Sequence, residues 1–568
     1  MTNKAIARIL KETADLLELT GSNPFRARAY HQAARTLERL EQPVSALADA
    51  LTDLPGIGEG LAAQIREILR RGSFDLRDRI LDELPPGLLD LLRIKGLGPK
   101  KVRTLWKRLG ITTLNALEHA AREGTLATLE GFGPRSQASI LEQIERYRTY
   151  AMWRRMDEVL PFLEALVATL SGQPGIVQVA ITGAARRCME TVDRAEVVIA
   201  TTEPSSVADT LEQVAFLYEQ LETETGQVLR GLLPDALPFA AHLVAPSSFG
   251  TILWHTTGAT SHVEAFLERF GTPPDLPDEQ ALYERVGLPF IPPELREGQD
   301  ELDAAAAGRL PDLITREHLH GTLHNHSTYS DGADTLEAMA RAAYEAGYAY
   351  FGICDHSRSL KVAHGLSVED VLRQHREIDR LNAGYAGVAR PFRIFKGIES
   401  DILEDGSLDY PPDVLASFEL VVASIHSGFN MTRDEATRRL IKAIENPFTT
   451  ILGHPTGRLL LRREGYPVDL DAVLDACAAN GVALELNANP YRLDLDWRWV
   501  RKAIDRGIWI AINPDAHAVD QLDLIRYGVA VARKGWLTPE RCLNALSLED
   551  FRRWLALPRP ERLAFRRT

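Results

Sequence analysis

The sequence has few cysteines and no long apolar run. Its four cysteines, Cys188, Cys354, Cys477 and Cys542, stand far apart and form no Cys-x-x-Cys pair, which argues against a disulfide framework or a zinc ribbon. No stretch offers the roughly 20 uninterrupted apolar residues that a membrane-spanning helix needs. Residues 1–21 form an amphipathic pattern interrupted by charges and lack the apolar core of a secretory signal. We therefore expect a cytoplasmic protein.

The chain also lacks an overall positive charge, yet its basic residues are segregated. Residues 1–150 carry 23 Lys and Arg against 19 Asp and Glu, a net charge of +4. The whole chain has a net charge of −14, so the rest carries −18. The first third is therefore better suited to bind nucleic acid than the net charge of the whole chain suggests. The acidic remainder has two explanations, carboxylates gathered around cations or an ordinary solvated surface. At roughly 100 to 200 residues per domain, the length predicts several domains.

Residues 1–150 show helical periodicity, and an apolar-x-Gly-apolar-Gly pattern recurs in them at 54–65, 94–105 and 129–140. The two glycines permit a tight turn whose backbone amides, with the N-terminus of the next helix, can face a phosphate without reading bases. A helix cap explains any single turn equally well. Three such turns predict helix-hairpin-helix DNA binding. The expected contacts are Gly56, Gly58, Gly96, Gly98, Lys100, Lys101, Gly131 and Gly133.

The middle of the chain changes character. Strand-like runs at 176–183, 195–202 and 239–245 stand between helical segments, which predicts an α+β domain, and a Pro-rich passage at 288–314 predicts a linker. Past residue 318, seven strand-like segments alternate with helical ones, as a parallel (β/α) barrel requires.

These seven segments end in polar residues. In a barrel the C-terminal strand ends meet at one face, so the residues are expected to converge there. A lone histidine is better explained by a satisfied hydrogen bond, but uncompensated burial of so many would be very costly, and divalent cations compensate it. Imidazole with carboxylate suits Zn²⁺, Mn²⁺ or Fe²⁺ and disfavours Ca²⁺. The segment ends carry His324, His326, Asp355, His356, Glu399, His426, His454, Glu485, Asn487, Asn489, Asp515 and His517.

The motifs His-x-His followed by Ser-Asp-Gly, Asp-His, an isolated Glu, Ser-x-His, Gly-His-Pro and Asp-Ala-His resemble those of the PHP domain over about 315–560. The resemblance implies a distorted (β/α)7 barrel and three metal ions, Mn or Zn with Fe as a further option. It makes Glu399 the bridging carboxylate, Asp515 and His517 catalytic residues, and Arg492 either a phosphate clamp or a structural ion pair. The implied ligands are His324, His326, Asp331, His356, Glu399, His426, His454, Asp515 and His517.

Clustered divalent ions would lower the pKa of a water toward neutrality, neutralise a scissile phosphate and stabilise the departing oxyanion. No Ser, Cys or Lys need then serve as a covalent catalyst.

The N-terminal part resembles a bacterial family X DNA polymerase with a C-terminal PHP domain. Residues 23–37 match its small lyase-like domain, and 183–200 align with its palm motif, in which a Gly-Ser-x-Arg-Arg turn precedes an Asp-x-Asp pair. Here that pair is Arg194 and Glu196, and the third carboxylate position is Ala240.

Nucleotidyl transfer needs paired carboxylates around two Mg²⁺ ions, and Arg194 places a cation where a cation must bind. The turn serine is replaced by Ala184, and Asp193 stands one residue out of register, so that only a bulge would restore a ligand. We predict a palm fold without polymerase activity. The Schiff-base lysine of the lyase domain is also replaced, by Gln64, with Gly60 one turn earlier. Phosphate contacts by Arg26, Arg28 and Arg35 should remain, with affinity falling steeply in salt.

We therefore predict a DNA-repair phosphoesterase of the bacterial cytosol and nucleoid that acts on gapped, 3′-ended or abasic DNA. An active gap-filling polymerase, or a phosphatase of small phosphate monoesters, remains the alternative. The expected domains are a lyase-like helical domain (1–85), a fingers-like region (86–150), a degenerate palm (151–235), its end with a thumb-like region (236–300), a linker (301–317) and the PHP domain (318–568).

Overall fold

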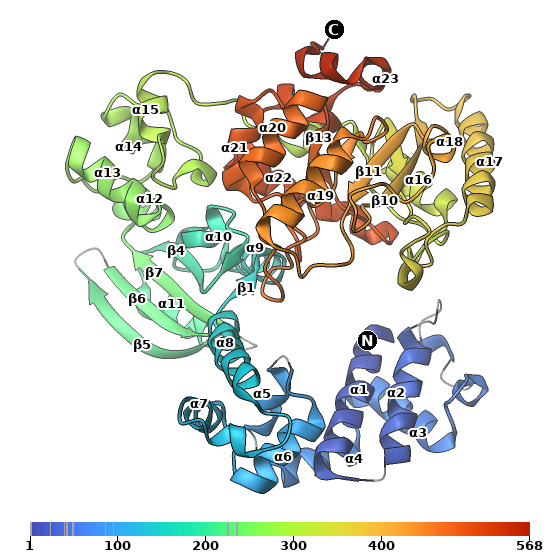
Figure 1. Cartoon of the computed structure of the whole chain (residues 1–568). Helices are drawn as coiled ribbons and strands as arrows, with labels where there is room; N and C mark the ends of the chain where they lie inside the picture. The colour runs from blue at the N-terminus through green and yellow to red at the C-terminus, as the bar shows by residue number, and fades with distance from the viewer. Residues whose placement is uncertain are drawn as a thin grey trace. The chain divides into compact units, whose positions relative to one another are not determined.

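The computed structural model describes residues 3–567 apart from 23, 39, 41–43, 48–49, 86, 95, 224–225 and 234–236 (Figure 1). The chain divides into two compact units, residues 1–152 and 153–568, which are described separately. The domain boundaries expected at 86 and at 235–236 fall on residues outside those described.

Unit 1 is all-helical, as predicted. Its first two helices pack along each other and bury Ile6, Leu10, Leu17 and Tyr30, the three- and four-residue spacing of an amphipathic helix. One hydrophobic core continues through the whole unit. The helices are α1 (Asn3–Thr20), α2 (Pro24–Glu38), α3 (Glu59–Arg71), α4 (Asp75–Glu83), α5 (Leu88–Arg93), α6 (Pro99–Leu109), α7 (Leu114–Arg122) and α8 (Pro134–Ala151).

Unit 2 begins with an α+β region built on a five-stranded sheet of order β2-β4-β7-β6-β5. Strands β4 and β7 are parallel and the other pairs are antiparallel. The helices α9 and α11 cover one face, and α12 covers part of the other. The strands are β1 (Arg154–Arg155), β2 (Ile176–Ile181), β3 (Thr191–Val192), β4 (Ala195–Thr201), β5 (Phe216–Thr223), β6 (Gly226–Leu232) and β7 (Pro238–Val244).

Helices connect these strands and then lead toward the C-terminal domain. They are α9 (Met156–Leu170), α10 (Gly183–Arg186), α11 (Pro204–Leu211), α12 (Phe249–Thr257), α13 (Thr260–Phe270), α14 (Glu279–Arg285) and α15 (Glu301–Ala306). The segment expected as a linker thus starts with a helix, whose Glu301 is buried and lies 2.6 Å from His262 Nδ1. The sequence does not predict this helix, because its Pro-rich surroundings indicate irregular chain.

The rest of unit 2 is a seven-stranded parallel sheet that curls into a near-closed barrel, with neighbours in chain order from β8 to β14 (Figure 1). The predicted (β/α)7 architecture is confirmed. The strands are β8 (Gly321–Thr322), β9 (Tyr350–Ile353), β10 (Arg393–Asp401), β11 (Leu420–Ser424), β12 (Ile451–Leu452), β13 (Ala483–Asn487) and β14 (Ile510–Asn513). A parallel bridge between Asn325 and Ala516 links the first and last strand ends.

Helices pack around the barrel and bury a large outer core. Inside it, Phe395, Trp509, Phe551 and Trp554 belong to a second core, so the interior is filled with side chains. The helices are α16 (Leu336–Glu345), α17 (Val368–Tyr385), α18 (Pro412–Leu415), α19 (Arg433–Glu445), α20 (Leu470–Asn480), α21 (Trp497–Asp505), α22 (Ile525–Lys534) and α23 (Leu548–Ala556). In the part of the chain described, no helix has the length and apolarity to cross a membrane.

Ion pairs join the barrel to the preceding region within unit 2. Arg458 lies 3.3 Å from Glu190, Arg533 lies 2.6 Å from Glu294, and the buried Lys534 pairs with Glu297. Charges this well buried must be compensated, and these contacts supply the compensation.

Candidate functional site

The residues predicted as metal ligands lie at the C-terminal ends of the barrel strands. His324 and His326 follow β8, and His356 follows β9. Glu399 lies near the end of β10, and His426 and His454 follow β11 and β12. Asp515 and His517 follow β14, while Asp331 stands on the loop after β8. Since parallel strands bring these ends to one face, side chains far apart in sequence become neighbours.

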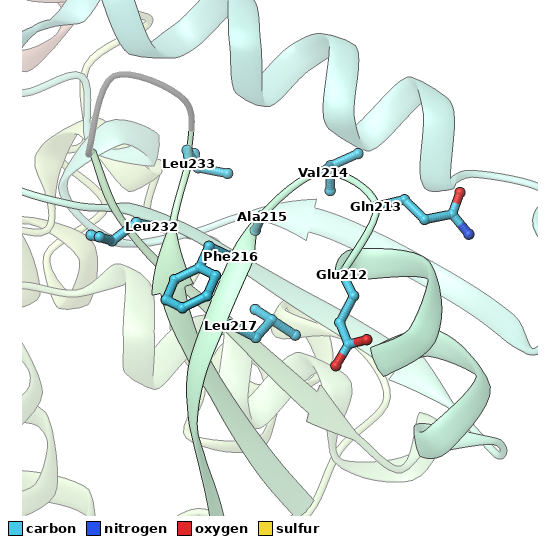
Figure 2. Close-up of a pocket in the computed structure, with 8 residues that line it drawn as sticks. All are labelled: Glu212, Gln213, Val214, Ala215, Phe216, Leu217, Leu232 and Leu233. Atoms are coloured by element: carbon cyan, nitrogen blue, oxygen red, sulfur yellow. The ribbon is translucent and has the colours of Figure 1, made fainter.

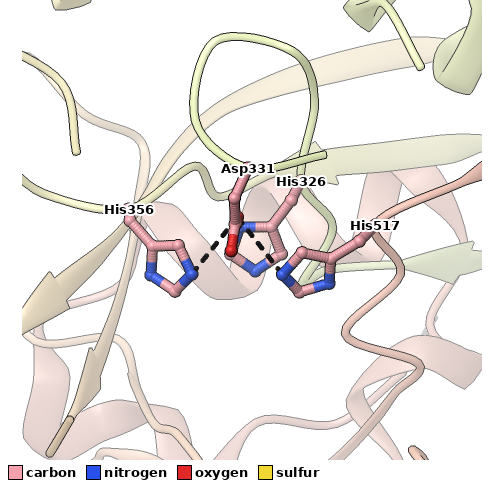
Figure 3. Close-up of side chains that lie close together, drawn as sticks. All are labelled: His326, Asp331, His356 and His517. Carbon is pink, nitrogen blue, oxygen red and sulfur yellow. Dashed lines mark ion pairs between the residues drawn. The ribbon is translucent and has the colours of Figure 1, made fainter. Parts of the chain in front are cut away.

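Three groups of these residues place their ligand atoms within 4.8 Å of one another. Figure 3 shows the four side chains of the first group pointing toward a common point, with dashed lines from Asp331 to His356 and His517. The groups are His326 with Asp331, His356 and His517; His324 with His326 and Asp515; and His356 with Glu399 and His426.

Glu399 lies at the centre of the cluster. Its carboxylate is 2.8 Å from His356 Nδ1, 3.1 Å from His426 Nε2 and 2.9 Å from His454 Nε2. His324 Nε2 is 3.5 Å away. The arrangement therefore fits the bridging role that the resemblance implies for this residue.

The buried polar atoms test whether ions fit this site. Among the described residues, His324 Nε2, His326 Nε2, Glu399 Oε2 and Asp515 Oδ1 are buried without a well-oriented hydrogen bond, although each lies close to an opposite group. An unsatisfied buried polar atom costs about 1–3 kcal/mol. Unpaired imidazole and carboxylate atoms converging on shared points are donors that suit a transition-metal dication. The residues present fit the implied metals.

Burial and neighbouring charges shift the pKa values of the cluster in opposite directions. Burial disfavours ionised Glu399, but His426, His324 and His356 outweigh it and hold its pKa well below the ordinary range. Burial works against protonated His517 and His426 too, yet nearby carboxylates raise the pKa of each to about 9. Burial with His517 and His356 lowers the pKa of His326 to about 3. A metal ion that binds here would have to displace any proton held on a ligating imidazole.

A layer of acceptors orients the ligands. Glu485 accepts from His324 Nδ1 at 2.7 Å and from the backbone N–H of His454 at 2.8 Å. Asp401 lies 2.5 Å from His426 Nδ1. Both contacts leave the opposite imidazole nitrogen, Nε2, to face the cluster, as is usual for ligating histidines.

Sequence reasoning placed Glu485 at a strand end without a role and missed Asp401. The signal for Asp401 was its position two residues after Glu399 on one strand, where alternate side chains share a face. Asp355, also at a strand end, accepts hydrogen bonds from Ser327, Ser330 and Gln374. It supports the His-x-His loop and points away from the ligand groups.

Local backbone geometry explains two motif residues. Asp515 has φ of 53° and His454 has φ of 22°, conformations that are costly for such residues and are found at functional sites. A Cβ at Gly453 would lie 2.3 Å from Ser424 Oγ, and one at Gly332 would lie 2.7 Å from the Ser327 backbone. The glycines of Gly-His-Pro and Ser-Asp-Gly are therefore required by close packing.

Arg492 stands beside the cluster, with its Nε 3.6 Å from Asp515 Oδ2 and its side chain mostly buried. This contact is compatible with both roles predicted for it, an ion pair with Asp515 and a cation facing a phosphate.

The three glycine turns of unit 1 share one conformation. The first glycine of each turn has positive φ and the second caps the following helix in an extended conformation. A Cβ at the capping Gly58, Gly98 or Gly133 would meet no atom within 4 Å, so the turns face open space. Their free helix N-terminal amides are therefore accessible to a phosphate. The first glycines are Gly56, Gly96 and Gly131, with φ of 80°, 91° and 85°.

The basic residues predicted beside these turns differ in their surroundings. Lys101 donates to the Gly96 carbonyl at 3.1 Å, so it stabilises its own turn. Lys100, Arg26, Arg28 and Arg35 are exposed.

The residues predicted to be degenerate palm positions lie together at the five-stranded sheet. Glu196 on β4 and Ala240 on β7 are register partners on adjacent parallel strands. Arg194 lies 3.8 Å from Glu196, and a third side chain, His242, lies 4.0 Å from it. A nucleotidyl-transfer site would need carboxylates at these three positions. Here only Glu196 has one, and the other two are the guanidinium of Arg194 and the methyl group of Ala240. Such a set is a poor ligand for two Mg²⁺ ions.

The two arginines of the palm turn are engaged elsewhere. Arg186 pairs with Glu279 at 2.5 Å, and Arg187 pairs with Glu297 at 2.8 Å. Ala184 has no hydroxyl, so the turn offers no serine to an incoming triphosphate.

A shallow hollow lies at the start of the β5–β6 hairpin, far in sequence from the metal ligands (Figure 2). Its lining carries one carboxylate and no imidazole, so it offers no metal site. The residues that line it are Glu212, Gln213, Val214, Ala215, Phe216, Leu217, Leu232 and Leu233.

Comparisons with known proteins agree with this geometry. A helix-hairpin-helix domain model matches residues 1–74, a SAM-like helix-hairpin-helix tandem model matches 88–146, and a PHP domain model matches 322–489. These are the regions of the glycine turns and of most of the metal cluster.

Among individual proteins, the DNA polymerase/3′-5′ exonuclease PolX of Bacillus subtilis (strain 168) is 36% identical over 575 residues, which cover 98% of this chain and 99% of that protein. A probable phosphatase of Thermoanaerobacter sp. (strain X514) is 28% identical over 242 residues, 41% of this chain and 90% of that protein. The probable phosphatase YcdX of Escherichia coli O81 (strain ED1a) is 28% identical over 233 residues, 39% and 88% of the two chains.

Proposed function

The chain belongs to the PolX family, bacterial family X DNA polymerases with a C-terminal PHP domain, and from this premise we propose that its barrel is a nuclease that processes DNA 3′ ends. The substrates are gapped, 3′-ended or abasic DNA, and the reactions are 3′-to-5′ exonucleolysis and the removal of 3′ blocking groups. Its place is the bacterial cytosol, at the nucleoid.

The convergence of imidazole and carboxylate atoms around Glu399 carries this proposal. The ligands are the nine residues named above, with Mn²⁺ or Zn²⁺, three ions per site, and Fe²⁺ as a further option. When bound, these ions supply Lewis acidity that lowers the pKa of water and offsets phosphate charge.

The residues of the chain then have distinct tasks. Glu399 holds the centre of the cluster, and Asp515 and His517 belong to the open side, where His517 is partly exposed. Arg492 lies at the rim beside Asp515 and can face a phosphate oxygen. The glycine turns of unit 1 bind the DNA backbone through helix N-termini.

The polymerase core binds DNA without extending it, in our proposal, because Arg194, Glu196 and Ala240 offer one carboxylate where two-metal catalysis needs several. Primer extension with Mg²⁺ and with Mn²⁺ tests this part. Robust incorporation by the wild-type chain would contradict it.

Digestion of 3′-labelled gapped DNA in Mn²⁺ tests the nuclease. We expect shortening of the labelled strand by the wild-type chain and none by the variant Asp515→Ala, His517→Ala. A matched variant on the barrel surface, Glu369→Ala, Asp413→Ala, removes exposed carboxylates and should cut normally. Cleavage that survives in the first variant would locate the catalyst elsewhere.

The similarity of the barrel to probable phosphatases favours one second candidate, hydrolysis of small phosphate monoesters. Turnover of a small monoester such as histidinol phosphate is compared with turnover of the labelled 3′ end. A strong preference for the monoester would contradict the proposed nuclease and favour the phosphatase activity.

A further inference from the structure

Residues 456–466, in the loop between β12 and α20, form part of the rim around the proposed metal ligands. They begin two residues after His454, at the face where the strand ends meet, and turn onto the segment that follows β13. There the Leu460 N–H donates to the Tyr491 carbonyl at 2.6 Å. Tyr491 directly precedes Arg492, whose guanidinium lies beside the cluster. The two segments therefore meet next to the site.

The ring of Tyr491 lies against two guanidinium groups at this rim. The Arg462 guanidinium carbon lies over the ring, 4.2 Å from its centroid, and an Arg462 N–H donates to the Tyr491 hydroxyl at 3.3 Å. The Arg155 guanidinium carbon lies 3.8 Å from the same centroid. Stacking on an aromatic face orients the planar guanidinium. Tyr491 thus holds Arg462 in place, although the Arg462 side chain is exposed.

The charge of Arg462 is not neutralised as that of its neighbours is. Arg155 pairs with Asp157 at 3.0 Å, and Arg458 of the same loop pairs with Asp496 at 2.8 Å. Within the described part of the chain, no carboxylate forms an ion pair with Arg462. An exposed guanidinium that packs on a ring through one face presents its other face to a ligand. That face suits a planar, anionic molecule such as a nucleotide.

Arg463 continues the cationic rim toward the cluster. Its Nη2 donates to the Gly457 carbonyl at 2.8 Å, and its guanidinium carbon lies 4.0 Å from the centroid of Phe429, on the loop after β11. Burial and the charge of Arg492 lower the pKa of Arg463, so the two cations act on each other. An anion lying along the rim would relieve this repulsion, and a nucleic-acid strand carries a charge at every nucleotide.

We infer that Arg462, stacked on Tyr491, is a platform for a nucleobase of the strand whose phosphodiester lies at the cluster, and that it sets the preference for strands over small phosphate esters. The inference rests on the proposed nuclease and adds the residue that recognises the strand beyond the scissile phosphate. Bases stack on aromatic and guanidinium planes with little regard to sequence. The role differs from that of Arg492, which faces a phosphate.

The test compares two substrates of the full chain in Mn²⁺, single-stranded DNA labelled at its 3′ end and bis(p-nitrophenyl) phosphate, a small diester without a nucleobase. The variants are Arg462→Ala and Arg462→Lys, the second of which keeps the charge and loses the plane. The matched control is Arg552→Ala, an exposed arginine on α23. That helix packs on Tyr350 and Trp509, at the opposite ends of the barrel strands.

We expect both Arg462 variants to raise KM for the strand about 10-fold, as the loss of one stacked base predicts. Their kcat on the strand and their hydrolysis of the small diester should match the wild type and the control. Full recovery of KM in Arg462→Lys would overturn base stacking, because charge alone would then suffice. An unchanged KM in Arg462→Ala, or an equal loss on the small diester, would also overturn the inference.

Failure of the proposed nuclease is read separately, from the wild-type chain. If that chain leaves the strand intact, the nuclease proposal fails, and the dissociation constant of the same strand in EDTA then reports on the platform. Binding about 10-fold weaker in the two Arg462 variants alone would still support the platform. Equal binding by the wild type, both variants and the control would overturn it.

Discussion

Among single residues, Glu485 contacts two of the proposed metal ligands. It accepts from His324 Nδ1 and from the His454 backbone N–H, and so positions two predicted ligands, one after β8 and one after β12. The Glu485→Gln variant keeps the shape and loses the charge. We expect its Mn²⁺ affinity to fall about 10- to 100-fold, measured by calorimetric titration of the metal-free chain.

The control for this prediction is Glu369→Gln, which makes the same change from carboxylate to carboxamide at an exposed position on α17 of the same domain. Unchanged metal affinity in Glu485→Gln would show that the contact to His324 is structural and does not orient a ligand.

The raised pKa of His426 and His517 makes the stability of the metal-free protein pH-dependent. Both titrate near 9 when folded, above the ordinary value of about 6.5. Their contribution is complete below about pH 6.5 and is lost as the pH rises through 9. In EDTA we expect Tm to fall between pH 6.5 and 9.

With saturating Mn²⁺ the trend should vanish or reverse, because the ion replaces the protons and competes best at high pH. The His426→Gln, His517→Gln variant should show no such fall in EDTA. An equal fall in that variant would assign the effect to other groups.

The sequence predicted which residues come together, because eight of the nine proposed ligands stand at predicted strand ends and parallel strands bring those ends to one face. The choice among the strand-end residues, and the addition of Asp331, came from the resemblance to the PHP domain. The sequence was not sufficient for their partners. Lys101 looked like a phosphate contact from its spacing, yet the structure turns its ammonium onto Gly96. Side-chain direction depends on packing that a one-dimensional pattern does not contain.

Among the elements, the short strand β12 depends on the glycine that follows it. A Cβ at Gly453 would lie 2.3 Å from Ser424 Oγ on β11 and 3.5 Å from Glu485 on β13. We expect Gly453→Ala to cost about 1–3 kcal/mol of unfolding free energy, measured by denaturant titration.

Gly384 on α17 provides the contrast, because a Cβ there meets no atom within 4 Å. Gly384→Ala should leave metal binding intact and add up to about 1 kcal/mol through helix propensity. Equal stability of the two variants would contradict the packing argument.

The elements that the sequence predicted well are those with strong periodicity, the helices of unit 1 and the barrel strands. The β5–β6 hairpin was missed because most of β5 is exposed and shows no apolar alternation. Helix α15 was missed because prolines surround it. Its burial comes from the long-range packing of Leu302, Ala304 and Ala305 in the core and from the contact of Glu301 with His262.

At the scale of the whole molecule, the barrel and the polymerase-like region of unit 2 are tied by buried charge. Lys534 of α22 is fully buried against Glu297, which also binds Arg187 of the palm turn. Removing the carboxylate leaves a buried ammonium unpaired. We expect Glu297→Gln to cost about 3–5 kcal/mol, measured by urea unfolding.

The double variant Glu297→Gln, Lys534→Met should recover part of that loss, because no unpaired charge remains. Additive losses in the double variant would contradict a direct coupling of the two residues.

The overlap of the three ligand groups has a last consequence. His326 and His356 each stand in two groups, so the occupancy of one position fixes the imidazoles that the next position needs. Because neighbouring positions share an imidazole and would place like charges close together, we expect the proposed ions to load and leave in an order, which a stepwise chelator titration would resolve.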